Sequence, residues 1–301
     1  MKTFRLLLTV AVAILMAACS KGSASGGEDP VKPQEPTVKL PVKLSIGLTT
    51  RATDNSFETG DEIGVYMVNY SGSTPGTLAN SGNYMNNVKF SFNGSWNPSS
   101  AWYWKDESTH ADFYVYYPYG SPGNVFGHAF TVQTDQSSEG NYKKSDFIWG
   151  KKGNVAPTSA NVSIQTSHIM SCAVIKLAAG DGITDEEISS GDVKVVINNV
   201  KNNATVNLSN GDVQASGEVS VITPLKVNGE YKSIVVPQEV AECNLITIFL
   251  DGQEFNFKKG FTFQKGKKHT FTITLSRTSG GLSVEISDWE NDGNDNGGVA
   301  E

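Results

Sequence analysis

Apolar and polar residues alternate along residues 38–48, which read VKLPVKLSIGL. Successive side chains of a β-strand point to opposite faces, so this pattern predicts a strand with one face on a core. At about 1.5–3 kcal/mol per buried aliphatic side chain, six of them would contribute on the order of 10 kcal/mol. Losing the strand would therefore leave an unstable groove. Its apolar face comprises Val38, Leu40, Val42, Leu44, Ile46 and Leu48.

Most of the chain beyond this stretch also has the pattern of strands. The runs EIGVYMVN, DFYVYYPY, MSCAVIKLAA, VKVVINNV, YKSIVVP, NLITIFL and HTFTITL are rich in β-branched or aromatic residues. Asn93-Gly94, Asn210-Gly211 and Asp251-Gly252 lie between such runs and are typical of tight hairpin turns. Only GITDEEISSG favours a short helix. We therefore expect an all-β chain of sandwiches built from many short antiparallel strands.

The stretch APTSANVSIQTS separates an aromatic-rich half of the chain from an aliphatic half. It predicts an N-terminal β-sandwich over residues 37–165, with 38–48 as its first strand, and a C-terminal β-sandwich over residues 166–290. Residues 291–301, which read NDGNDNGGVAE, are expected to form a flexible tail.

The first residues carry an export signal. Residues 1–18 combine two basic residues with a short apolar run and small residues just before Cys19. This arrangement favours a bacterial lipoprotein signal with lipidation of Cys19, against an ordinary signal peptide followed by a chance cysteine. Residues 19–36, rich in Gly, Ser and Pro, are predicted to be a disordered tether.

Arginine is rare in this chain and one arginine has a notable position. The 301 residues contain 24 Lys and Arg together, of which three are Arg: Arg5, Arg51 and Arg277. Arg51 follows the alternating strand directly, in a polar segment without strand pattern, where proteolysis concentrates. Beyond residues 1–18, an arginine-specific protease would thus have Arg51 as its first possible site and Arg277 as its second. Arg51 also fits an ordinary solvated loop residue.

Charge and chemistry exclude several classes of function. The net charge of −7 and the lack of a basic cluster argue against nucleic acid. Four histidines lie far apart, no known catalytic motif is present, and we predict neither an enzyme nor a metal or cofactor site. Cys172 and Cys243 are expected to be free and buried, with a disulfide as the alternative. The histidines are His110, His128, His168 and His269.

A belt of aromatic residues occupies the middle of the first half. Trp96, Trp102 and Trp104 stand at its centre, with several tyrosines after them. Such rings pack cores and cross-strand pairs, and they also stack on sugars. Glycan binding by an outer-membrane surface lipoprotein is therefore the alternative function.

Taken in order, these features resemble the fimbrillin (Mfa-like) proteins, the type V pilins of Gram-negative anaerobes. The resemblance rests on the lipobox cysteine, the alternating strand, TTRAT, FETGDEIGVYMVNY, NYMNNVKFSFNGSW, AWYWKDESTHADFYVYYPYG, SHIMSCAVIKLAAG, VVPQEV and LSVEISDWEN. It implies two tandem transthyretin-like Greek-key β-sandwiches, export as an outer-membrane lipoprotein, and a role in surface adhesion as part of a fimbrium.

The resemblance also implies a maturation step. An arginine-specific protease would cut after Arg51 and leave Ala52 as the new N-terminus, releasing residues 38–48. A donor strand from another fimbrial subunit would then fill the groove. One candidate donor is GGLSVEISDW, which places Leu282, Val284 and Ile286 on one face, and which fits equally well a last strand of the second sandwich.

Overall fold

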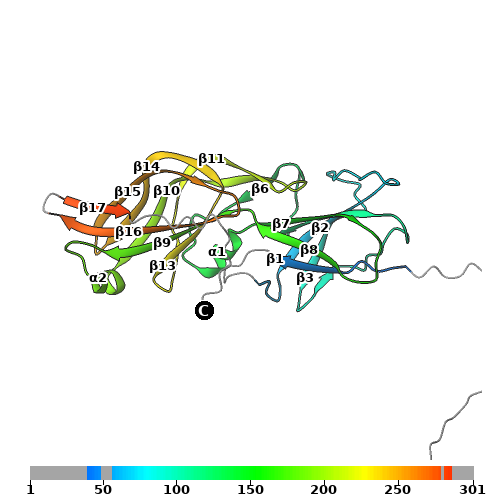
Figure 1. Cartoon of the computed structure of the whole chain (residues 1–301), viewed down its shortest axis with the longest axis horizontal. Coiled ribbons are helices and arrows are strands. Elements are labelled where there is room, and N and C mark those ends of the chain that lie inside the picture. The colour runs from blue at the N-terminus through cyan, green and yellow to red at the C-terminus, as the bar shows by residue number, and fades with distance from the viewer. Residues whose placement is uncertain (1–38, 49–55, 279–280, 287–301) are drawn as a thin grey trace, which may run out of the picture. The chain divides into compact units, whose positions relative to one another are not determined.

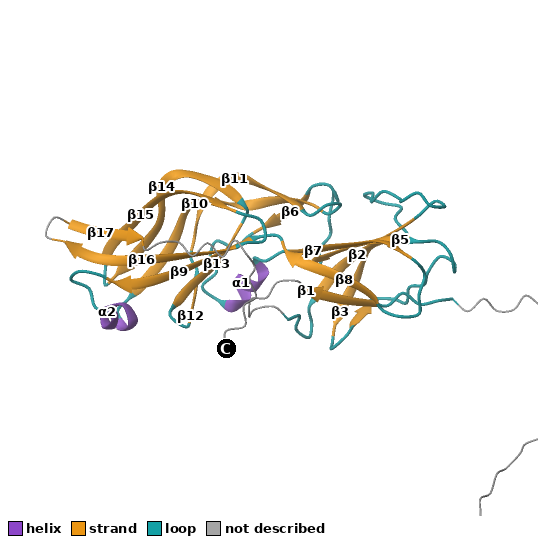
Figure 2. Ribbon diagram, viewed as in Figure 1, coloured by secondary structure: helices purple, strands orange, loops and turns teal. Residues whose placement is uncertain are grey.

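The computed structural model describes residues 39–48, 56–278 and 281–286, and side chains in these ranges except at 278 and 281–286. Strands make up most of this part of the chain (Figures 1 and 2), so the predicted β-rich class is confirmed. The predicted signal peptide at 1–18, the tether at 19–36 and the tail at 291–301 lie outside the described residues.

The first half of the chain forms a seven-stranded sheet. All neighbours in it are antiparallel except the first pair, which is parallel. Its order is β1 (Leu44–Leu48), β8 (Val162–His168), β7 (Ile148–Val155), β5 (Ala111–Tyr117), β2 (Glu62–Asn69), β3 (Met85–Phe92) and β4 (Trp96–Pro98).

This sheet curls until its two edges approach each other. β1 and β4 are the edge strands in the pairing order, yet they contact one another. The link is completed by Pro41, just before β1, which forms an isolated antiparallel bridge with Tyr103, just after β4. The sheet is therefore nearly a barrel, and residues 39–48 lie where it closes.

Two five-stranded sheets contain the other ten described strands. The second sheet has the order β11 (Asp212–Ile222), β10 (Val193–Asn207), β14 (Gln238–Leu250), β15 (Gln253–Phe263), with β6 (His128–Thr131) also paired to β10. The third has the order β12 (Leu225–Val227), β13 (Glu230–Val235), β9 (Ser171–Ala179), β16 (Lys268–Thr278), β17 (Gly281–Ile286).

Most neighbouring strands are antiparallel, as expected, but two pairs are parallel. β1 pairs parallel to β8, and β9 pairs parallel to β16. Parallel neighbours need a long connection between them, and here each pair is separated by many other strands in the sequence. Hydrophobic patterning within a strand carries no information about such distant partners.

Predictions from short sequence signals agree with the structure better than the predicted strand pairing does. Asp251 and Gly252 have φ values of 50° and 80° in the turn between β14 and β15, the left-handed conformation that a two-residue hairpin requires. The predicted short helix is α2 (Asp185–Ser190), which begins with a capping box between Thr184 and Glu187. A second helix, α1 (Glu139–Lys144), was not predicted.

Buried side chains gather in two clusters, and β2 contributes to both. Ile63, Val65 and Met67 belong to the cluster inside the seven-stranded sheet, whereas Tyr66 and Val68 belong to a larger cluster with the strands of the other two sheets. Burial on both faces explains why β2 is a continuous apolar run rather than an alternating one. The domain boundary at residue 165 stays a prediction, and the larger cluster includes residues from both sides of it.

Cys172 and Cys243 are free, as expected, but they are half-buried rather than buried. Burial raises the pKa of the Cys172 thiol, whose Sγ lies 3.6 Å from the Tyr142 hydroxyl. The thiol therefore stays protonated at neutral pH and behaves as a small apolar group.

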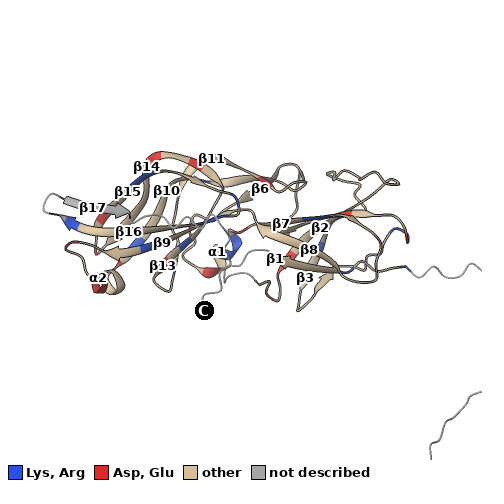
Figure 3. Cartoon of the chain, viewed as in Figure 1, with Lys and Arg blue, Asp and Glu red and all other residues tan. Residues whose placement is uncertain are grey.

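Residues of both charges are interspersed along the strands (Figure 3). One ion pair joins Lys151 to Asp112 at 3.0 Å, with the carboxylate almost fully buried. Burial alone would raise the pKa of Asp112, but hydrogen bonds from the Asn154 N–H and from Lys151 outweigh it and lower the pKa. Among the described residues, no helix is long and apolar enough to cross a membrane.

Candidate functional site

The candidate site is residues 39–48, which we call the first-strand segment, together with the surface that it covers. Its strand β1 lies beside β8 at the edge of the seven-stranded sheet (Figure 1). In the parallel register Leu44 lies opposite Val162 and Leu48 opposite Thr166. The Val162 N–H donates a hydrogen bond to the Lys43 C=O at 2.8 Å. Within this sheet β1 is thus an edge strand with a single neighbour.

The residues just before β1 pair with a second element, residues 102–104, which we call the aromatic wall. The Val42 N–H donates to the Trp102 C=O at 2.9 Å. The Trp104 N–H donates to the Leu40 C=O at 2.8 Å. The segment therefore changes partner along its length, from an antiparallel bridge on the wall to a parallel ladder on β8, and it spans the gap between them.

Burial alternates as predicted from Lys39 to Ser45, whereas Ile46, Gly47 and Leu48 are all half-buried. Val42 and Leu44 are 3% and 4% exposed, and both belong to the core cluster inside the sheet. Leu40, Ile46 and Leu48 are half-buried, whereas the intervening Lys39, Pro41, Lys43 and Ser45 are exposed. Val38 lies outside the described residues.

The segment contributes less to stability than the sequence suggested. Of the five apolar positions that the structure describes, only Val42 and Leu44 are fully buried, so these two side chains account for roughly 3–6 kcal/mol rather than about 10. The remaining positions lie near the rim because β1 is an edge strand. Because the segment contributes less to stability, the rest of the chain is more able to stay folded after the segment is removed.

Beneath the segment lies an apolar strip contributed by distant parts of the chain. Ile164 is fully buried, and Val162 is 4% exposed in the same cluster. Trp96 and Trp104 complete the strip from the opposite edge of the sheet, at 7% and 4% exposure. If the segment left, this strip would lose its cover.

One side chain fastens the end of β1. Thr166 is 2% exposed, and its hydroxyl donates a hydrogen bond to the Gly47 C=O at 2.9 Å. A Cβ at Gly47 would lie 2.7 Å from the amide end of the Gln165 side chain, which would have to shift to make room for it. Sequence patterns did not indicate Thr166, because a threonine in a strand has no distinctive spacing.

The aromatic wall is fixed independently of the first-strand segment. The Tyr84 hydroxyl donates to the Tyr103 C=O at 3.1 Å, and burial raises the pKa of Tyr84. The Thr109 hydroxyl and the backbone N–H groups of Ser108 and Thr109 bind Asp106, which holds the pKa of this carboxyl well below its usual range. These contacts hold the loop after the wall in place.

The opposite side of the groove depends far more on the segment. Among the described residues, β8 pairs with β7 only where Ile148 and Trp149 meet the end of β8. From Val162 to Thr166 its ladder partner is β1. Without β1, most of β8 would keep no backbone partner.

The tryptophans proposed for glycan stacking serve the core. Trp104 packs edge-on against Phe113 with ring centroids 5.7 Å apart, and Trp96 is equally buried. Trp102 is half-buried and packs edge-on against Tyr84 at 6.2 Å. Because a buried ring cannot present a face to a sugar, the core alternative holds for Trp96 and Trp104.

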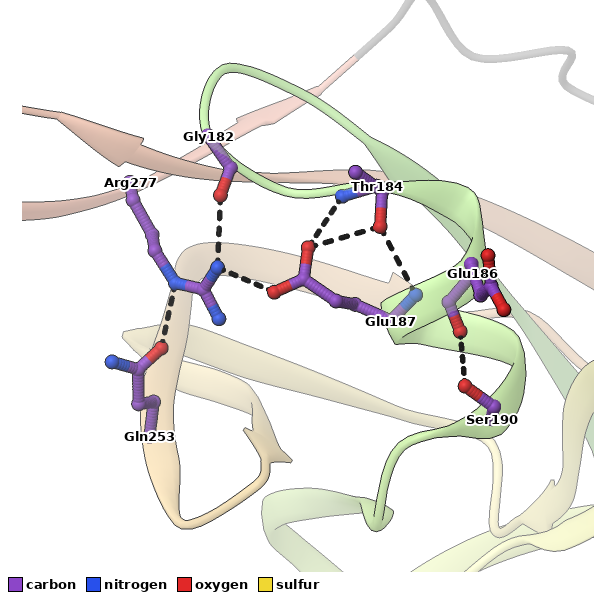
Figure 4. A network of polar contacts seen from close by, with 7 residues as sticks. All are labelled: Gly182, Thr184, Glu186, Glu187, Ser190, Gln253 and Arg277. Carbon is purple, nitrogen blue, oxygen red and sulfur yellow. Dashed lines mark hydrogen bonds and ion pairs between the residues drawn. The ribbon is translucent and has the colours of Figure 1, made fainter.

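Arg277 has a structural use, which Figure 4 shows. Its guanidinium contacts the Glu187 carboxylate at 2.7 Å, the Gly182 C=O at 2.8 Å and the Gln253 side chain at 2.8 Å. The hydrogen bond from Arg277 lowers the pKa of Glu187, which also closes the capping box of α2. Arg277 lies in β16, which pairs with β9 and β17.

Other predicted site residues lie outside the described part or are described only by their backbone. Cys19, Arg51 and Ala52 lie outside the described residues. The backbone of β17, which contains Leu282, Val284 and Ile286, pairs antiparallel with β16 at the edge of the third sheet. This is the arrangement of a last strand, and its use as a donor stays a prediction.

Comparison with known proteins identifies the family. The family model described as fimbrillin-like matches residues 50–289. A Bacteroides uniformis protein that carries the name fimbrium subunit Fim1C is 27% identical over 96% of each chain. A Bacteroides ovatus protein named as a fimbrium tip subunit is 30% identical over 43% of this chain and 26% of its own length. A crystal structure of a cell adhesion protein from Bacteroides uniformis shares the fold, with a TM-score of 0.63 and 23% identity over 85% of this chain and 99% of that one. The chain therefore belongs to the fimbrillin-like family.

Proposed function

We propose that this chain is a structural subunit of a surface fimbrium that serves adhesion, and that its first-strand segment is a removable placeholder. The observation that carries the proposal is the segment itself, an edge strand whose apolar face covers a buried strip between β8 and the aromatic wall. The fimbrium subunit and cell adhesion protein that this chain resembles support the same function.

The chemistry of assembly is strand addition. Once the segment leaves, the strip around Ile164 and Trp104 loses its cover, and β8 loses most of its backbone partners. An extended strand from another fimbrial subunit satisfies both needs, since backbone hydrogen bonds supply affinity and alternate side chains set the register. The uncut subunit is then a monomer whose own strand blocks assembly.

Cleavage after Arg51 is the proposed release step. Arg51 follows the last residue of β1 by three positions, so a cut there separates the segment from the rest of the chain and leaves Ala52 as the N-terminus. Arg277 is a poor alternative because it pairs with Leu282 of β17, its N–H donates to the Asp181 C=O at 2.7 Å, and its guanidinium is engaged. Before the cut, lipidated Cys19 would hold the subunit on the outer membrane.

Two tandem Greek-key, transthyretin-like β-sandwiches divided near residue 165 are the architecture that we propose for the subunit. The two core clusters and the seven-stranded sheet in the first half of the chain support it. A fibre of such subunits would place the strand contact of each at the closing edge of the first sandwich.

The test is limited digestion of the chain from Ser20 onward with an arginine-specific protease, followed by intact mass and size-exclusion chromatography. We expect one new N-terminus at Ala52, and oligomers that appear as the released peptide separates. Arg51→Lys is the matched control, because it keeps the charge and removes the site, and it should stay monomeric. A cut protein that remains a stable monomer contradicts the proposal and turns attention to a glycan-binding surface lipoprotein.

A further inference from the structure

Two indole N–H groups beside the first-strand segment have no hydrogen-bond acceptor. The Nε1 atoms of Trp102 and Trp104 are buried and unpaired among the described residues. Both residues belong to the aromatic wall, on either side of Tyr103, and both pack against the core under the segment. Buried tryptophan N–H groups usually find a partner, so two orphans in one short stretch are unusual.

The register explains why these groups lack an acceptor. The bridge between Pro41 and Tyr103 is antiparallel, so Val42 lies opposite Trp102 and Leu40 lies opposite Trp104. Directly opposed side chains of an antiparallel pair point to the same face and lie in contact distance. Both opposed side chains are hydrocarbons and cannot accept a hydrogen bond.

The other ring contacts of the two indoles are also apolar. Trp102 meets the Tyr84 ring, whose hydroxyl donates elsewhere, and Trp104 meets the Phe113 ring. Each buried donor left unpaired shifts an equilibrium against the state that contains it, by roughly fivefold or more. The chain's own strand is therefore an imperfect occupant of its groove.

We propose that the natural replacement strand carries hydrogen-bond acceptor side chains at the two positions that align with Leu40 and Val42. The partner is thus an extended segment of another subunit with Asn, Gln, Ser or Thr at these positions, followed by apolar residues at the positions of Leu44, Ile46 and Leu48. The inference rests on the proposed function and adds a reason why strand exchange proceeds toward the intersubunit strand. Exchange converts two orphan donors into two hydrogen bonds, which favours the intersubunit strand over the released one.

The direct test uses the full-length protein after cleavage at Arg51 and removal of the released strand. Three synthetic peptides are titrated: residues 38–48 unchanged, the same with Leu40→Asn and Val42→Thr, and the same with Leu40→Ala and Val42→Ala. The acceptor peptide should bind at least about tenfold more tightly than the Ala peptide, which has lost similar apolar contacts. The two indole N–H resonances should move downfield with the acceptor peptide alone.

The Trp102→Phe/Trp104→Phe variant separates the hydrogen bonds from general fit. Phe keeps an apolar ring and removes the N–H, so the advantage of the acceptor peptide should vanish in this variant. If the unchanged peptide rebinds but the acceptor peptide gains nothing, or keeps its gain in the Phe variant, the inference is wrong while the proposed function stands. If no peptide binds the cut protein, the proposed function itself fails.

A second measurement applies where the cut protein assembles before it can be titrated. In the uncut full-length protein, Val42→Thr is compared with Val42→Ala, each with and without Trp102→Phe, by urea unfolding. We expect the Thr variant to gain at least about fivefold in the folding equilibrium constant over Ala when Trp102 is present, beyond its gain when Phe is present. Equal gains in both backgrounds overturn the inference.

Discussion

At the scale of single residues, the alternation of side chains along the first strand decides which of them are buried. Leu44 and Ser45 are neighbours, but Leu44 is 4% exposed in the core and Ser45 is exposed to solvent. Because strand side chains alternate between faces, the sequence predicted this difference correctly before any partner strand was known. The extent of burial was not predictable. Leu40, Ile46 and Leu48 occupy the same alternating apolar positions of the sequence as Leu44, yet they are only half-buried.

Truncation at these two neighbours should give opposite results. Leu44→Ala removes a fully buried side chain and should cost about 2–5 kcal/mol of unfolding free energy. Ser45→Ala changes an exposed position and should stay within about 0.5 kcal/mol of the unchanged protein. Urea unfolding of the two variants checks the prediction, and equal losses would show that β1 does not pack as described.

His128 should make stability depend on pH. Its ring lies among Tyr116 and Phe147, with centroids 5.7 Å and 5.9 Å away, and burial lowers its pKa below the usual value near 6.5. The unfolded chain therefore binds a proton at a higher pH than the folded chain does. The stability from this group is present above pH 6.5 and is lost as the pH falls through the folded pKa.

His128→Gln removes this titration. The difference in urea midpoint between the unchanged protein and the variant should change between pH 7.5 and pH 5.5, with the unchanged protein losing more stability on acidification. A parallel pH dependence for both proteins would show that His128 is not the titrating group.

At the scale of elements, the partners of β1 decide how it is held. Thr166 joins β8 to the Gly47 C=O by a buried hydrogen bond, in addition to the parallel ladder. Thr166→Val keeps the shape of the side chain and removes the hydroxyl. We expect a loss of about 1 kcal/mol and a faster release of the cut strand, measured as dissociation of the 20–51 peptide after cleavage. Thr158→Val removes a half-buried hydroxyl that accepts a hydrogen bond from the Ala160 N–H, before β8 begins. It serves as the control and should not change the release rate.

The elements also show how far sequence patterns reach. Alternation predicted β1, the Asp251-Gly252 pair predicted a hairpin, and the capping residues Thr184 and Glu187 accompany the predicted helix α2. These signals are local, because each depends on residues a few positions apart. The parallel partner β8 lies more than a hundred residues further along, and its pairing depends on the closure of the whole sheet.

The candidate site was predictable only in part for the same reason. The first strand was found from its alternation, but the aromatic wall at 102–104 was interpreted as a belt of rings and not as a backbone partner of Leu40 and Val42. The tryptophan–tyrosine–tryptophan order at this place is itself a short alternating pattern, with Tyr103 facing outward and the indoles facing inward. That pattern could have indicated a strand-like wall.

At the scale of the whole molecule, the first-strand segment completes a nearly closed sheet. The two elements that flank it, the aromatic wall and β8, differ in how much they depend on the segment for their contacts. The aromatic wall is held by the hydrogen bond from the Tyr84 hydroxyl to the Tyr103 C=O, whereas β8 relies on β1 for most of its backbone pairing. Removing the segment should therefore leave one side of the groove in place and loosen the other. An incoming strand would restore order to β8 as it binds.

The measurement that tests this account most directly is amide hydrogen exchange of β8 in three states: uncut, cut with the segment removed, and assembled. We predict that residues 162–166 are protected in the uncut chain, lose protection when the segment leaves, and regain it in the oligomer. The strands β9 and β16 should stay protected in all three states and serve as the internal reference. If β8 stays protected after the segment is removed, or stays exposed in the oligomer, strand replacement at this groove is contradicted.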